Sequence, residues 1–227
     1  MTAADTILTA LADVQRERQR RADDPTLGRR VAVVKQFQQQ RLRDTYADLS
    51  ATERYRQATT FFLEELYGPE DFAQRDAQFA RVVPGLAKLF PAEVVKTVVA
   101  LSQLHALSER FDTEMAATAG TAADSALTAA NYARAWRAVG QADERERQIA
   151  LLLQVGLALH HHTRSRLLRT SLHMMRAPAR AAGLEALQHF LEAGFDSFGA
   201  MGGAQEFMQT IAARERQLAA ELFAGVG

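Results

Sequence analysis

The sequence predicts an all-α protein, a single globular bundle of about eight or nine helices around a central apolar helix at about residues 143–176. Apolar residues recur along almost the whole chain with the spacing of one helix face. Strand signals are weak, because apolar and polar residues never alternate for long and aromatic residues make up only 7% of the chain. The connections between helical segments are short, which favours one domain over residues 1–227.

The chain begins with two helices that the segment 23–28 separates. The apolar face of the first helix carries Ile7, Leu11 and Val14. We predict that residues 1–24 form an N-terminal helical arm. We interpret its arginines as a solvated helix end, because acidic residues lie among them. The second helix starts at about Leu27, and its inward residues are Val31, Val34, Leu42 and Leu49.

Capping and breaking residues delimit the next two helices. Ser50 and Glu53 have the S-x-x-E spacing of a capping box, which predicts a helix from there through Tyr67. Gly68 is expected to end this helix and Pro69 to begin the next, since glycine is common after a helix and proline in its first turn. This fourth helix is predicted to bury Phe72, Phe79 and Val83.

A long helix follows, and glycine and proline again mark its ends. Pro84 with Gly85 is predicted to break the preceding helix. Pro91 then begins the long helix, and Gly120 ends it.

The central helix is preceded by a shorter one at residues 124–139. Within the central helix, the segment 149–159 is apolar on every side, which only a helix surrounded by other helices tolerates. Pro178 separates the central helix from one that reaches Phe198. The final helix carries the apolar residues Phe207, Ile211, Leu218 and Leu222.

Composition excludes several classes of function. The 27 basic and 27 acidic residues cancel, so no global field draws the chain to nucleic acid or to an anionic membrane. Cysteine is absent, which excludes disulfides, thiolate metal sites and cysteine nucleophiles. The longest apolar run, residues 149–159, is too short to cross a bilayer, and the chain starts without the pattern of a signal peptide. We therefore expect a cytoplasmic protein with neither nucleic-acid nor membrane partners.

Three consecutive histidines end the apolar run of the central helix, in the stretch "LALHHHTRSR". At about 100° per residue, His160 lies on the same face as Ile149, whereas His161 and His162 flank it. Consecutive residues of one helix cannot all bind one metal ion. We interpret His160 as a core histidine bonded to a neighbour or as part of a cofactor-binding site.

The helix that begins at Pro91 offers a second set of polar residues. His105 and Asp112 fall inside its apolar arc, and Glu109 lies at the edge. A histidine with inward carboxylates fits an oriented general base, a cofactor-binding site or a metal site. The alternative is a buried polar network that fixes the position of the helix.

Glu65 is a further predicted metal ligand, because it flanks the inward face of its helix. Glu65, His105, and Glu185 with His189 resemble, in spacing only, the ligand order of the heme-oxygenase-like di-iron oxidases. That resemblance implies a di-iron site that includes Glu65, His105, Glu185 and His189. Helical phase alone gives His105, Glu109, Asp112 and Glu65 as the candidate metal ligands. The sequence departs from the family's pattern at Ser102, where a carboxylate is expected, and places Glu185 and His189 on a solvated face.

Three functions remain open on the sequence alone. The first is a non-enzymatic protein that binds an apolar small molecule, a cofactor or a partner helix, possibly as a homodimer. The second is a metal- or heme-dependent enzyme with its site inside the bundle. The third is an adaptor that uses the N-terminal arm to bind a partner. No nucleotide-binding or hydrolase motif is present.

Overall fold

The computed structural model describes residues 1–66, 68 and 72–225, without the side chains of residues 86–89. Regular structure in these ranges is entirely helical, which confirms the predicted all-α class. The elements are α1 (Ala3–Asp23), α2 (Pro25–Thr45), α3 (Ala47–Ala51), α4 (Glu53–Phe61), a π-helical turn (Phe62–Leu66), α5 (Ala73–Leu89), α6 (Ala92–Ala119), a 3₁₀ turn (Gly120–Ala123), α7 (Ala129–Val139), α8 (Ala142–Thr163), α9 (Arg166–Met174), α10 (Arg176–Ala181), α11 (Glu185–Ala200) and α12 (Gln205–Ala224). The described helices outnumber the predicted ones, because several predicted segments are interrupted.

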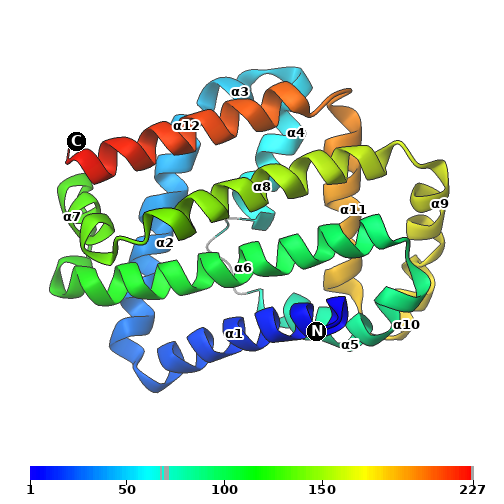
Figure 1. Ribbon diagram of the computed structural model, residues 1–227, viewed down its shortest axis with the longest axis horizontal. Helices are drawn as coiled ribbons and strands as arrows, with labels where there is room; N and C mark the ends of the chain where they lie inside the picture. Colours follow the sequence, from blue (N-terminus) through cyan, green and yellow to red (C-terminus); the bar gives the residue numbers. More distant parts are fainter. Residues whose placement is uncertain (67, 69–71, 226–227) are drawn as a thin grey trace.

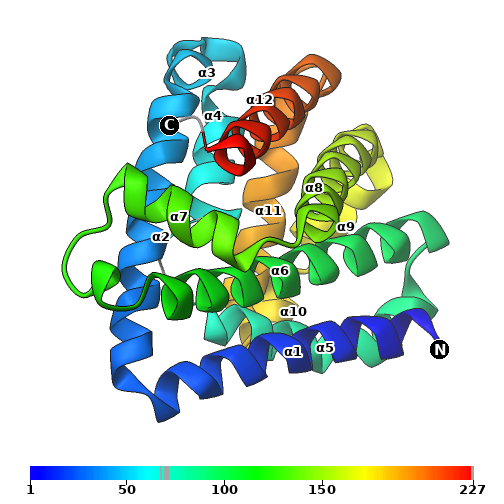
Figure 2. The ribbon, with the colours of Figure 1, turned by 60° about the vertical axis from the view of Figure 1, so that its left-hand side comes forward.

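The helices form two layers with different directions. In Figure 1, α1, α6, α8 and α12 run in roughly the same direction across the front, while α2, α4 and α11 cross behind them. The turned view in Figure 2 shows the same crossing. Helix α6 packs against α1, α2, α7 and α8, and α8 packs in turn against α11 and α12. The centre of the molecule is therefore shared by α6 and α8.

Apolar side chains fill the space between the layers. The largest cluster joins α4, α6, α8, α11 and α12 and includes Phe61, Phe111, Leu152, Phe198 and Phe207. A second cluster surrounds Tyr132 and Trp136 of α7. Helix α1, which contains the predicted arm, buries Ile7, Ala10, Leu11 and Val14 and packs along α5 and α6.

The central helix is shorter than the sequence predicts. Helix α8 ends at Thr163, and Ser165 caps a separate helix, α9, by accepting a hydrogen bond from the backbone N–H of Leu168. Leu167 and Met174, which one continuous helix would place on the same face as Ile149, are 76% and 72% exposed. The prediction of one helix over residues 143–176 is thus wrong beyond Thr163, because a local cap ends it.

The apolar segment of α8 is also not buried on every side. Leu151, Leu152 and Val155 are buried, but Leu157 is partly exposed. Gly156 lies against α12, where an added Cβ would come within 2.3 Å of the sulfur of Met208. The missing side chain therefore allows α8 and α12 to approach closely.

Several predicted helix ends are confirmed and others are wrong. Pro91 precedes α6, and Gly120 and Gly140 end α6 and α7 with positive φ angles. The capping box of Ser50 and Glu53 is wrong: α4 follows Thr52, and residues 47–51 form α3. The break predicted at Pro84 is wrong as well: α5 continues through this proline to Leu89.

The boundary predicted at Gly68 and Pro69 lies partly outside the described residues, since the structure describes neither Tyr67 nor residues 69–71. The next helix, α5, begins at Ala73. Of the three residues predicted to be buried there, Val83 is fully buried, whereas Phe72 and Phe79 are half-buried. None of the helices in the described ranges has both the length and the apolar character needed to cross a membrane.

Candidate functional site

A cavity of about 80 Å³ lies in the interior, where α2, α6, α7, α8 and α12 meet. Its wall combines aromatic rings with charged groups. The rings belong to Phe62, Phe72, Phe111, Tyr132 and Trp136. The titratable residues are Lys35, Arg41, His105, Glu109, Asp112, Arg145 and Glu215. The predicted residues His105, Glu109 and Asp112, all on α6, therefore line one cavity.

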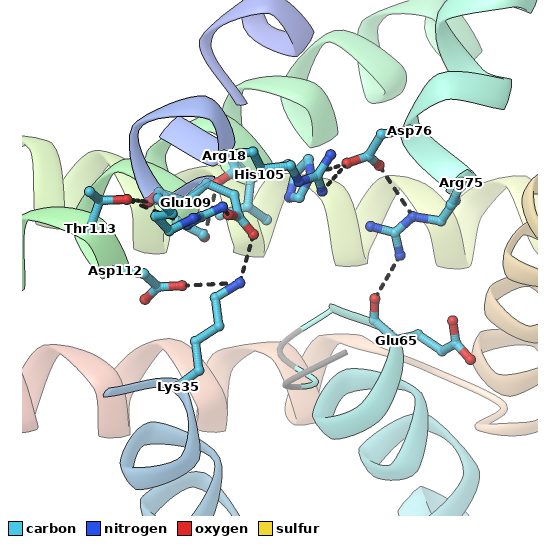
Figure 3. Close-up of polar contacts among 12 residues, drawn as sticks. Arg18, Lys35, Glu65, Arg75, Asp76, His105, Glu109, Asp112 and Thr113 are labelled. Carbon is cyan, nitrogen blue, oxygen red and sulfur yellow. Dashed lines mark hydrogen bonds and ion pairs between the residues drawn. The ribbon is translucent and has the colours of Figure 1, made fainter. Parts of the chain in front are cut away.

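Glu109 is buried between two cations that come from other helices. Arg21 of α1 and Lys35 of α2 donate to its two carboxylate oxygens at 2.5 and 2.7 Å (Figure 3). Burial alone would raise the pKa of Glu109, but Lys35 and Arg21 hold it at about 2. Glu109 is therefore ionised at neutral pH and fixes α6 to α1 and α2.

His105 belongs to a second buried ion pair. Its Nε2 lies 2.7 Å from a carboxylate oxygen of Asp76 on α5, and Arg18 of α1 donates to the same oxygen at 2.7 Å (Figure 3). Burial opposes ionisation of Asp76, yet His105, Arg75 and Arg18 together lower its pKa to about 2. Because Asp76 is ionised, Nε2 of His105 carries the proton and donates.

Asp112 is less well paired than the other two acids. Its carboxylate lies 3.6 Å from Nζ of Lys35, which already donates to Glu109 (Figure 3). Burial raises the pKa of Asp112, and the charge of Glu109 adds to this effect. Lys35 thus lies between two carboxylates on successive turns of α6, and a hydrogen bond with Gln38 also favours the ionised form of Asp112.

Arg145 of α8 differs from every other cation in the wall. It is only 4% exposed, and its guanidinium carbon lies 3.7 Å from the ring centroids of both Phe111 and Trp136. Within the part of the chain that the structure describes, its buried Nε and Nη2 atoms have no hydrogen-bond partner. Burial lowers the pKa of Arg145 to about 10, so the group still carries its charge at neutral pH.

The structure does not gather the predicted metal ligands into one site. Glu65 lies apart from the cavity: its backbone oxygen accepts a hydrogen bond from Arg75, and its carboxylate is 3.8 Å from Nε2 of His189. Among the described residues, no three His, Asp or Glu side chains are arranged to hold a metal ion. Glu109 and Asp76 are instead paired with cationic side chains.

His160, the third predicted cofactor-binding residue, is half-buried near the end of α8 and does not line the cavity. Its Nδ1 lies 3.3 Å from the backbone oxygen of Phe198. His161 is exposed, and His162 contacts the hydroxyl of Thr97 at 2.9 Å. The structure therefore does not bring His160 and His105 into one site.

Sequence analysis missed the partners that come from other helices. The interpretation of the α1 arginines as solvated is wrong for Arg18 and Arg21, whose side chains are 16% and 13% exposed. Arg145 was overlooked in the charged stretch that begins α8. It lies four residues before the buried Ile149, and that spacing places both on one helix face. Helical phase, applied to arginine, would have identified it.

Comparisons with known proteins add a family assignment. No curated protein and no solved structure matches the chain. A family model matches residues 17–226, a range that includes every residue lining the cavity. The chain therefore belongs to the family described as a domain of unknown function (DUF8198).

Proposed function

We propose that the protein is a non-enzymatic binder of a small molecule, which it holds in the cavity between α2, α6, α7, α8 and α12. One observation carries this proposal: the interior contains about 80 Å³ of space lined by both rings and charges. Protein interiors are packed about as densely as organic crystals and leave few spaces larger than one water molecule. At about 80 Å³ the cavity is smaller than the pockets that hold drug-sized ligands, so it suits only a very small molecule.

The composition of the wall indicates what kind of molecule fits. Phe62, Phe111 and Trp136 offer apolar surface to the body of a ligand. Gln38, Asp112 and Tyr132 offer polar groups that would orient it. The supported ligand is thus a small molecule with an apolar body and at least one polar group, which is more specific than the apolar molecule that the sequence predicts.

The state of the carboxylates favours binding over acid–base catalysis. A general base that works near neutral pH is most effective when its pKa lies near that pH. Glu109 and Asp76 have pKa values of about 2, and each is paired with two cations, Arg21 and Lys35 for Glu109 and Arg18 and Arg75 for Asp76. Both acids therefore serve to hold helices together around the cavity.

Filling the cavity tests this proposal. Ser108 of α6 lines the wall, and its hydroxyl accepts a hydrogen bond from Gln148 at 2.9 Å. Ser108→Phe would place a ring in the cavity, whereas the control Ser108→Ala removes the same hydroxyl and leaves the space open.

The measurement is the melting temperature of each protein with a panel of charged and neutral small molecules. We expect a ligand to raise the melting temperature of the wild type and of Ser108→Ala, because ligands stabilise the state that binds them. We expect Ser108→Phe to lose the response. An equal response in Ser108→Phe would show that binding occurs elsewhere and would contradict the proposal.

A further inference from the structure

Of the lysine and arginine residues described in the cavity wall, Lys35 and Arg41 already have an acidic partner. Lys35 donates to Glu109 at 2.7 Å, and Arg41 donates to Glu215 at 2.9 Å. Arg145 faces the same cavity, but the described part of the chain gives its Nε and Nη2 atoms no acceptor. A buried cation without an acceptor is costly, so the site favours a ligand that supplies one.

The rings around Arg145 decide where that ligand can bind. Phe111 and Trp136 both lie 3.7 Å from the guanidinium carbon, so aromatic contacts hold the group from two sides. Among the described residues Arg145 has these ring contacts in place of an ion pair, and its Nε and Nη2 atoms have no acceptor. Two parallel N–H groups of a guanidinium match the two oxygens of a carboxylate.

We infer that the ligand of this cavity is a small carboxylate, whose two oxygens accept hydrogen bonds from the guanidinium of Arg145. This inference rests on the binding function proposed above and adds the chemical class of the ligand. The apolar part of such a molecule would lie against the rings of the wall.

Charge and size both restrict the ligand to a small monoanion. Glu109, Asp112 and Glu215 also line the cavity, so a dianion such as phosphate would meet more repulsion than a single carboxylate. A volume of about 80 Å³ corresponds to roughly five to eight water molecules. That space accommodates a short-chain acid and is too small for a nucleotide.

Propionate and propionamide provide a matched pair of probes, because they have the same shape and differ in charge. The full-length protein is titrated with each compound, and with inorganic phosphate, by calorimetry in Tris chloride buffer at neutral pH. We expect propionate to bind at least about tenfold more tightly than propionamide or phosphate. The reason is that the pairing of a charged acceptor with a buried guanidinium changes the dissociation constant by more than about tenfold. Equal binding of propionamide, or tighter binding of phosphate, would overturn the inference.

Two substitutions of Arg145 test its role directly. Arg145→Met keeps a long side chain between the rings and removes the charge, so we expect it to lose propionate binding by at least about tenfold. Arg145→Lys keeps the charge but cannot form the paired hydrogen bonds, and we expect a smaller loss. If Arg145→Met does not fold, Arg145→Lys alone remains decisive. Unchanged propionate binding in either folded variant would overturn the inference.

The outcomes separate this inference from the proposed function. If neutral compounds bind as well as acids and Ser108→Phe abolishes both, the binding function holds and the carboxylate assignment is wrong. If no compound of the charged and neutral panel binds the wild type, both proposals are wrong.

Discussion

Two kinds of buried charge lie in the wall of the cavity or directly behind it. Glu109 is paired with Arg21 and Lys35, and Asp76 with Arg18 and Arg75, whereas Arg145 lies against two rings and the described residues give it no acidic partner. The paired acids join α1, α2, α5 and α6, and other side chains of the protein compensate their charge. In the second kind, the buried Nε and Nη2 atoms of a cavity-lining arginine have no acceptor among the described residues. The contrast teaches that pairing, more than burial, distinguishes a structural charge from one available to a ligand.

The largest effect should follow from breaking a paired charge. Glu109→Gln leaves Arg21 and Lys35 buried without their carboxylate, and we expect it to lower the free energy of unfolding by about 3–5 kcal/mol. Urea denaturation at neutral pH measures the change. The control Glu93→Gln alters an exposed pair with Lys96 and should leave the free energy of unfolding almost unchanged. A similar small loss in both variants would contradict the structural role of Glu109.

Acid should weaken the same paired charges. The folded-state pKa values of Glu109 and Asp76 are depressed to about 2 from 4.5 and 3.8, so their stabilisation is present above about pH 4.5 and is lost as the pH falls through 2. Each group should account for about 2–3 kcal/mol of that loss. Urea midpoints between pH 5 and pH 2.5 measure it. The slope should be smaller in Asp76→Asn, and a slope equal to that of the wild type would refute the assignment.

Removing the unpaired charge should have a much smaller effect on stability. In Arg145→Met, the loss of two ring contacts opposes the relief of burying a charge without an acceptor, so the free energy of unfolding should change by less than about 1 kcal/mol. The same urea measurement, made without added ligand, checks this. A loss as large as that of Glu109→Gln would mean that Arg145 is a structural charge.

Asp112 is intermediate in its pairing, because its ion pair with Lys35 is long, at 3.6 Å. Its substitution should change the free energy of unfolding least. Burial raises its folded-state pKa, so its contribution to stability is present at acid pH and declines as the pH rises through that pKa. We expect Asp112→Asn to be within about 1 kcal/mol of the wild type at neutral pH and to remove that decline. Thermal melts from pH 4 to pH 8 compare the two proteins. A large loss at neutral pH would show that the contact with Lys35 is a strong ion pair.

The sequence predicts the helices better than it predicts the site. Apolar spacing identifies the all-α class, and Pro91 and Gly120 mark the ends of α6, because these signals are local. The helix break predicted at Pro84 and the continuous helix predicted over residues 143–176 are both wrong. A proline can remain within a helix that tertiary contacts hold, and Ser165 caps a separate helix. Helix ends thus depend on contacts that periodicity does not contain.

The residues that one helix contributes to the candidate site are predictable from the sequence, whereas their partners are not. Helical phase alone brings His105, Glu109 and Asp112 to one side of α6, and all three line the cavity. Their partners come from distant segments: Arg21 is 88 residues from Glu109, and Asp76 is 29 residues from His105. No spacing rule within one helix predicts such pairs. Likewise, only the assembled helices show that the described residues give Nε and Nη2 of Arg145 no acceptor.

The most direct test of the central claim is to locate a bound acid by nuclear magnetic resonance. Intermolecular nuclear Overhauser effects are recorded between propionate and the aromatic protons of the wild-type protein. We predict contacts from its methyl and methylene protons to the rings of Phe111 and Trp136, and their loss in Arg145→Met. Contacts to rings outside the cavity, or contacts that persist without Arg145, would contradict the account.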